Sequence, residues 1–141
     1  MESLYIQPTN NTPEIKGNLE RNEISFKGGC HPENVIAYFE PVFRWVDDYF
    51  THYVQTHRAC EVTLAFYFDY LNTASMKYVV EFLFKMKRVR EHGAKLIVNW
   101  YYLPNDSQIE EDGHDISYAV DIPFNIQQLK EADDTGRNLS K

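Results

Sequence analysis

The sequence lacks the features that usually mark secreted and membrane-spanning proteins. Its 141 residues contain two cysteines, Cys30 and Cys60, which are far apart and do not have the spacing of a metal site. No apolar run approaches the roughly 20 residues that a membrane-spanning helix needs. Residues 1–6 do not have the basic and then apolar pattern of a signal peptide. Two isolated thiols without a secretion signal predict reduced cysteines and a cytoplasmic location.

Positive charge is also scarce. The chain has 14 Lys and Arg residues against 21 Asp and Glu residues, which gives a formal net charge of −7. Nucleic-acid backbones and anionic lipid surfaces attract clustered Lys and Arg side chains. The composition therefore argues against nucleic acid and against a membrane as partners.

Catalytic and metal-binding motifs are missing as well. None of the five histidines belongs to an H-E-x-x-H pair or a zinc-type array, and there is no G-x-S-x-G, Gly-rich phosphate loop or dinucleotide fingerprint. His114 lies between Glu110–Asp112 and Asp115, which suggests a cation site, although a solvated acidic helix face is the simpler interpretation. Residues 100–102 form a possible stacking platform, but core packing and an ordinary sheet face explain these rings better. We therefore predict no catalytic residue, metal ligand or cofactor, and keep a small metal-dependent enzyme as an alternative.

Apolar and aromatic residues are plentiful, at 43% and 15% of the chain, and their periodicity predicts the fold. A helical pattern begins at Asn34, a second helix is predicted over Ala74–Glu91, and an acidic helical segment over Ser107–Ala119. We predict an α/β fold in one domain, residues 1–129, followed by a polar tail, residues 130–141. Its mixed sheet should contain mainly four to five strands, with two long helices and a short acidic helix. The extended segments are 3–6, 14–19, 23–27, 61–71, 95–102 and 124–129.

Several local features carry more specific expectations. Gly28-Gly29 is expected to close the hairpin formed by the second and third extended segments. Pro41 is expected to kink or break the first helix, and Gly93 to cap the second. Alternation along residues 61–71 places Tyr70 on the same face as the apolar side chains. The strand–helix–strand unit that follows is expected to be a right-handed parallel crossover.

The junction between the strand ending at Leu71 and the second helix is the most informative part of the sequence. Asn72, Thr73 and Ser75 form a short polar turn at the start of the helix. Such residues commonly cap helices, because their oxygens accept hydrogen bonds from unpaired backbone N–H groups. The same N–H groups and the positive end of the helix dipole also favour a phosphate on an exposed hydroxyl. Lys77, one turn later, would help to neutralise it.

With these residues, the chain resembles the SiaC family of bacterial regulatory phosphoproteins, whose fold is similar to the STAS domains of anti-sigma-factor antagonists. The resemblance covers about residues 3–129. It rests on these segments: Leu4-Tyr5-Ile6, Thr12-Pro13, Pro32-Glu33-Asn34, Phe39-Glu40-Pro41 through Trp45, Tyr70-Leu71-Asn72-Thr73-Ala74-Ser75, Val98-Asn99-Trp100-Tyr101-Tyr102 and Pro123-Phe124.

The resemblance implies a non-catalytic signalling protein with a STAS-like sandwich fold. It implies phosphorylation of Thr73 by a dedicated Ser/Thr kinase, with removal of the phosphate by a PP2C-type phosphatase. Ser75 is the second choice, because Ala74 stands where a serine is common in the family. The unphosphorylated form is then expected to bind, and to activate, a diguanylate cyclase or a similar effector, which links it to cyclic-di-GMP and biofilm behaviour. The expected contact residues are Leu71, Asn72, Ala74, Ser75 and Lys77. A constitutive protein-binding module, in which the turn only caps the helix, is the alternative.

Overall fold

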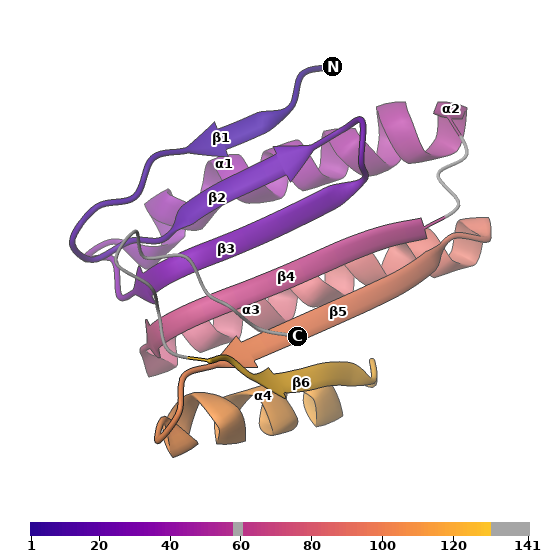
Figure 1. The fold of residues 1–141 in the computed structure, drawn as a ribbon. Coiled ribbons are helices and arrows are strands. Elements are labelled where there is room, and N and C mark those ends of the chain that lie inside the picture. The colour runs from indigo at the N-terminus through magenta and orange to yellow at the C-terminus, as the bar shows by residue number, and fades with distance from the viewer. Residues whose placement is uncertain (58–60, 131–141) are drawn as a thin grey trace.

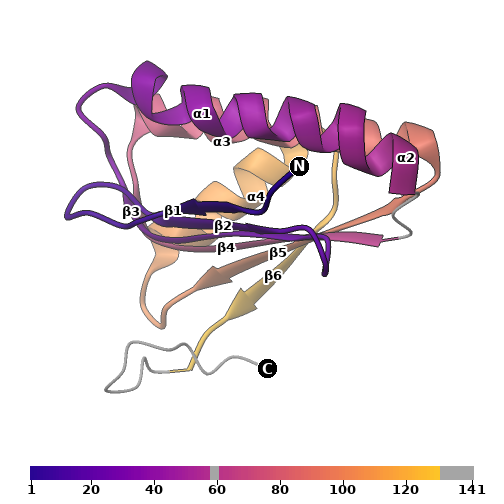
Figure 2. The ribbon, with the colours of Figure 1, turned by 90° about the horizontal axis from the view of Figure 1, so that it is seen from above.

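The computed structural model of the protein describes residues 1–57 and 61–130. It contains one six-stranded sheet and three helices of 14 residues, all on one face of the sheet, as Figure 2 shows. The elements in chain order are β1 (Leu4–Ile6), β2 (Glu14–Asn18), β3 (Glu23–Cys30), α1 (Val35–Asp48), a π-helical segment (Tyr49–Val54), α2 (Gln55–His57), β4 (Glu61–Leu71), α3 (Thr73–Met86), a 3₁₀ segment (Lys87–His92), β5 (Lys95–Tyr102), α4 (Ser107–Val120) and β6 (Phe124–Gln128).

The strands lie in the sheet in the same order as in the chain (Figure 1). β1, β2 and β3 are antiparallel, whereas β3, β4, β5 and β6 run parallel to one another. The parallel pairing predicted across the second helix is confirmed. The predicted count of four to five strands was too low, because the edge strands β1 and β6 have only three and five residues. Such short segments become strands through pairing with a neighbour, and periodicity alone does not reveal this.

The helices pack on the sheet through apolar stripes. α4 ends within one residue of the predicted segment Ser107–Ala119, but it has the same length as α1 and α3, so it is not the short helix that was expected. Its acidic outer face hides a buried stripe that includes Gly113, where an added Cβ would lie 2.5 Å from the Trp100 ring. This close approach lets α4 lie directly on β5. The expected STAS-like sandwich is therefore corrected to two layers, with one six-stranded sheet and three helices.

Pro41 does not break the first helix. α1 continues through it from Val35 to Asp48. A proline inside a helix removes one backbone hydrogen bond. Phe39, Val42 and Val46 on both sides of it are at most 1% exposed, so their burial holds the helix together through this position.

Gly28-Gly29 lies inside β3 and does not close the hairpin. The turn before β3 falls at residues 20–22, as predicted, and β3 then continues to Cys30. Gly28 has a φ of +123°, a conformation that glycine adopts readily. The register between β3 and β4 shifts at this point, because Gly28 pairs with Phe68 and Gly29 pairs with Tyr70. Asp69 is thus an extra, bulged residue in β4.

Of the remaining predictions, the helix cap at Gly93 is confirmed, and those for Cys60 and for most of the tail concern residues that the structure does not describe. Gly93 ends the helical segment after α3 with a φ of +85°, as predicted for a helix cap. Cys60 and, apart from Lys130, the predicted tail lie outside the described residues. Among residues 1–57 and 61–130, no helix has the length and apolar character needed to cross a bilayer.

Candidate functional site

The candidate site is the turn between β4 and α3. Asn72 is the N-cap of α3, and its side-chain oxygen accepts a hydrogen bond of 2.8 Å from the Ser75 backbone N–H. The capping role predicted for this turn therefore belongs to Asn72. Thr73 is the first helical residue and its side chain is exposed. Within the described part of the chain, no hydrogen bond involves the Thr73 hydroxyl.

The first two backbone N–H groups of α3 are free to bind an anion. Within residues 1–57 and 61–130, the backbone N–H groups of Thr73 and Ala74 have no hydrogen-bond acceptor. No acidic side chain lies in the first turn of α3. The positive end of the α3 dipole therefore lies beside the exposed Thr73 hydroxyl, and no carboxylate of the first turn neutralises it. This geometry favours an anion on Thr73.

Other predicted contact residues differ in exposure. Ala74 and Lys77 are exposed, so both lie on the same accessible surface as Thr73. Leu71 is 7% exposed and Ser75 is 0% exposed, so both belong to the core. A kinase has no access to the Ser75 hydroxyl in this structure, and the burial argues against Ser75 as a second acceptor.

Ser75 lies against Cys30 in the core. Its hydroxyl oxygen has no hydrogen bond of ordinary geometry in the described residues, and the neighbouring thiol is only a weak partner. Burial raises the pKa of the Cys30 thiol to about 11, and the contact with Ser75 lowers it less strongly. The thiol therefore stays protonated and unreactive at neutral pH.

The β4 bulge adds two neighbours to the site that the sequence did not predict. Because Asp69 is an extra residue, Asp69 and Tyr70 are both exposed while Leu71 points into the core. The prediction that Tyr70 lies on the buried face was therefore wrong; its side chain is 54% exposed. The Tyr70 ring contacts the His31 ring edge to face, with 5.2 Å between centroids. The bulge becomes visible only when β3 pairs with β4, which brings the Gly28-Gly29 pair beside Asp69.

The turn is tied to the end of β3. The Asn72 backbone N–H donates to the Cys30 carbonyl at 3.1 Å, and the His31 N–H donates to the Asn11 carbonyl at 2.9 Å. Since β3, β4 and β5 are parallel, the starts of α1, α3 and α4 all lie at the carboxyl ends of these strands (Figure 1). The accessible surface at this end of the sheet therefore includes the positive dipole ends of α1, α3 and α4.

The acidic segment around His114 does not form a cation site. In the described ranges, no group of three His, Cys, Asp or Glu side chains is arranged to hold a metal ion. Asp112 turns into the protein and is 3% exposed, where it accepts a 2.9 Å hydrogen bond from Gln108. Trp100 is fully buried and its ring N–H donates to the Ile109 carbonyl at 2.8 Å, so core packing explains it, as predicted.

Comparison with known proteins identifies the family. A family model described as SiaC family regulatory phosphoprotein matches residues 6–129. The chain belongs to the SiaC family. A relative from Pseudomonas aeruginosa strain UCBPP-PA14, an uncharacterized protein, is 28% identical over 127 residues, which cover 90% of this chain and 97% of the relative.

Solved SiaC structures have the same fold. Apo-SiaC from Pseudomonas aeruginosa is 25% identical, with a TM-score of 0.76 over 89% of this chain and 98% of that one. A second match is SiaC in a crystal structure of the diguanylate cyclase SiaD with its activator SiaC, from the same species. This match is 26% identical, with a TM-score of 0.77 over 89% of this chain and 98% of that chain. A SiaC protein from Pseudomonas aeruginosa thus forms a complex with a diguanylate cyclase as its activator, and this chain belongs to the same family.

Proposed function

We propose that this SiaC family member is a non-catalytic signalling protein of the cytoplasm that is controlled by reversible phosphorylation of Thr73. A Ser/Thr protein kinase adds the phosphate and a PP2C-type phosphatase removes it. The unphosphorylated form binds, and activates, a diguanylate cyclase or a similar effector. The solved complex of SiaC with SiaD supports this class of partner.

The exposure of Thr73 is the observation that carries the proposal. Asn72 caps α3, so the Thr73 hydroxyl is not needed for capping and is accessible to a kinase. A phosphate there would add about 1.5 to 2 negative charges beside unpaired N–H groups. The free protein would tolerate this charge well, because the start of α3 carries no carboxylate of its own in the first turn.

The same charge would oppose a complex that covers the turn. Closing an interface over a phosphate removes water from it, which costs free energy unless the partner supplies cations. Phosphorylation would therefore favour the free form over the complex. Each 1.4 kcal/mol of lost binding free energy corresponds to a tenfold loss of affinity.

The test uses two matched threonine and serine positions. Ser107 is the exposed first residue of α4, as Thr73 is of α3. In protein purified from the native host, phosphatase treatment should lower the intact mass by one phosphate. Thr73→Ala should abolish that difference and Ser107→Ala should leave it unchanged. If Thr73→Ala still carries phosphate, the site is wrong. If the wild-type chain never does, the constitutive binding module is the better description.

A further inference from the structure

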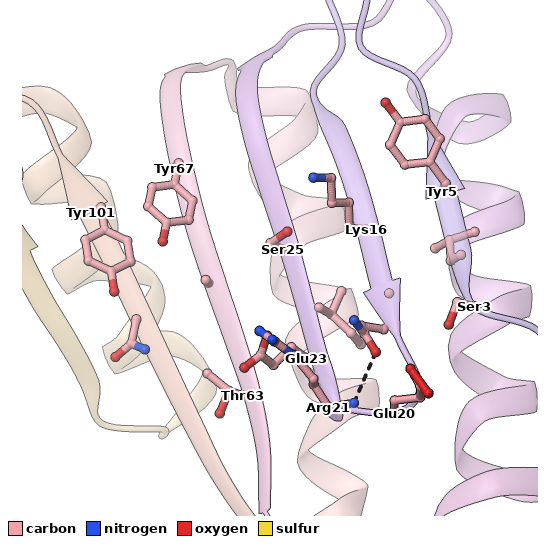
Figure 3. A pocket seen from close by; sticks show the side chains of 16 residues that line it. Ser3, Tyr5, Lys16, Glu20, Arg21, Glu23, Ser25, Thr63, Tyr67 and Tyr101 are labelled. Carbon is pink, nitrogen blue, oxygen red and sulfur yellow. Dashed lines mark hydrogen bonds between the residues drawn. The ribbon is translucent and has the colours of Figure 1, made fainter. Parts of the chain in front are cut away.

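The helix-free face of the sheet contains a groove that is separate from the Thr73 turn. The groove is open to solvent, has a volume of about 690 Å³ and crosses β1 to β5 (Figure 3). Sites for small molecules commonly have volumes of about 300 to 1,000 Å³. The helices lie on the opposite face of the sheet, so they do not cover this groove (Figure 2).

The floor of the groove is low because the central strands carry short side chains there. Strand register places Ser25, Ala65 and Asn99 side by side across β3, β4 and β5. Thr63 lies two residues before Ala65 and points to the same face. Since these side chains are small or short, the middle of the sheet is hollow between taller neighbours.

Aromatic rings form the walls. Tyr67 on β4 and Tyr101 on β5 stack face to face, with 4.4 Å between ring centroids and 5° between ring planes. Tyr101 is only 5% exposed, so the half-buried Tyr67 is the ring of this pair that a ligand would meet. Tyr5 stands on the β1 side (Figure 3). Burial raises the pKa of Tyr67 to about 12, and the neighbouring Tyr101 adds to this effect. Like an ordinary tyrosine, Tyr67 is protonated at neutral pH, and its hydroxyl can donate a hydrogen bond.

The charges of the lining cancel. Lys16 and Arg21 supply two cations, and Glu20 and Glu23 supply two carboxylates (Figure 3). The Lys16 ammonium also lies 3.8 Å from the Glu14 carboxylate. Arg21 forms no ion pair within the described residues. A nucleotide or another polyanion would gain from the cations but would be opposed by the carboxylates. The lining thus favours a ligand that is neutral as a whole and contains both hydrogen-bond donors and acceptors.

Polar groups in the floor have unused hydrogen-bonding capacity. In the described ranges, no side-chain hydrogen bond is made by the hydroxyls of Ser25 or Thr63. The Asn99 oxygen accepts from Asn125 at 3.1 Å, which leaves the Asn99 amide NH₂ group available. Hydroxyl groups of a ligand would match these partners, and a tyrosine face would pack against the apolar side of a sugar ring.

We propose that this groove binds a neutral polyhydroxylated compound, a short oligosaccharide. In the OB-fold, a β-sheet face together with adjoining loops binds oligosaccharides. The site is independent of the proposed phosphorylation, because Thr73 lies at the start of α3 and none of the lining residues belongs to that turn.

A nuclear magnetic resonance titration of the ¹⁵N-labelled full chain tests the proposal. The probes are maltotriose, cellotriose and N,N′-diacetylchitobiose, with adenosine 5′-monophosphate as a charged comparison. At least one sugar should shift backbone amides of residues 16–25, 63–67 and 99–101 in a saturable way. No saturable shift with any sugar, or saturation by the nucleotide alone, would overturn the proposal.

Substitutions then locate the site. Ala65→Gln fills the floor without removing a binding group and should weaken sugar binding at least tenfold. Ala119→Gln is the matched control, an exposed alanine on α4, and should bind like the wild type. Arg21→Gln, in the exposed β2–β3 turn, should also weaken binding and is safe for folding. Wild-type affinity in both Ala65→Gln and Arg21→Gln would exclude the groove. Thr73→Ala should bind sugar normally, which separates this result from the phosphorylation test.

Discussion

The starts of α3 and α4 follow one structural plan but carry different charges. Each helix follows a central parallel strand, and in each the N-cap side chain accepts from the N–H three residues later: Asn72 from Ser75 at 2.8 Å and Asp106 from Ile109 at 3.1 Å. Each first helical residue is an exposed hydroxyl, Thr73 or Ser107. A kinase would meet similar groups at the two positions.

Charge is what separates the two turns. α4 begins with the carboxylate of Asp106 and has Glu110 in its first turn, so its dipole is already compensated. α3 begins with the neutral Asn72 and has no acidic residue in its first turn. A phosphate would meet unpaired N–H groups at α3 and a carboxylate at α4. The comparison explains why an anion is favoured at one hydroxyl and opposed at the other.

Phosphomimetic substitutions should give the largest difference between the two turns. Thr73→Glu should weaken binding of the host diguanylate cyclase at least tenfold, about 1.4 kcal/mol, because a carboxylate must be desolvated in the interface. Ser107→Glu should change the affinity less than twofold. Isothermal titration calorimetry would measure both, with Thr73→Gln as a neutral control that keeps the affinity. Equal losses for the two Glu variants would contradict the assignment of the α3 turn as the contact surface.

Removal of the caps should cost similar amounts of stability but with different salt dependence. Asn72→Ala and Asp106→Ala should each lower the free energy of unfolding by about 1 kcal/mol, because one N–H loses its acceptor. The effect of Asp106→Ala should shrink at high salt, since part of it comes from charge and dipole attraction. Urea unfolding at two salt concentrations measures this. A salt dependence that is the same for both variants would argue against the charge difference.

The buried carboxylate of α4 should make stability depend on pH. Burial raises the pKa of Asp112, and the neighbouring acidic residues raise it further, while Gln108 lowers it. The folded protein therefore holds this proton more tightly than the unfolded chain, whose Asp pKa is about 3.9. The stability from this group is complete below that value and is lost as pH rises through the raised pKa. Asp112→Asn should be more stable than the wild type at neutral pH.

The advantage of Asp112→Asn should disappear as the pH approaches the ordinary Asp range. Thermal unfolding at a series of pH values checks this, with the exposed Asp48→Asn on α1, which does not influence the pKa of Asp112, as control. An advantage that does not change with pH would mean that packing, and not ionisation, is responsible.

Substitution of the third residue of α3, Ser75, should have the smallest effect on the free energy of unfolding. Ser75 in α3 and Ile109 in α4 both point into the core, but only Ser75 brings a hydroxyl without a good partner. Ser75→Ala should leave stability unchanged or raise it by less than about 0.5 kcal/mol, because little hydrogen bonding is lost. Chemical unfolding measures the change. A loss above about 1 kcal/mol would show that the contact with Cys30 is a strong hydrogen bond.

Local patterns in the sequence were sufficient to predict the positions of most helices and strands. β4 and β5 have the predicted boundaries, Glu61–Leu71 and Lys95–Tyr102, because alternation and turn residues coincide there. The turn containing Thr73 was also predicted, since capping residues separate a strand pattern from a helix pattern. These signals depend on residues close together in the chain.

Features that depend on distant residues were not predictable in the same way. The orientation of Tyr70 results from pairing between β3 and β4, and the burial of Ser75 results from its contact with Cys30. The persistence of α1 through Pro41 depends on packing over its whole length. The floor of the groove arises only when Ser25, Ala65 and Asn99 come into register.

The bulge between Gly28-Gly29 and Asp69 has a genetic consequence. One surplus residue in β4 places Tyr70 on the surface and Leu71 in the core just before the turn that carries Thr73. Under the proposed function, a mutation at Gly28, some 45 codons upstream of Thr73, should therefore impair the response although Thr73 itself is unchanged. A screen for loss of response in this gene should recover lesions in that glycine pair as well as at the threonine.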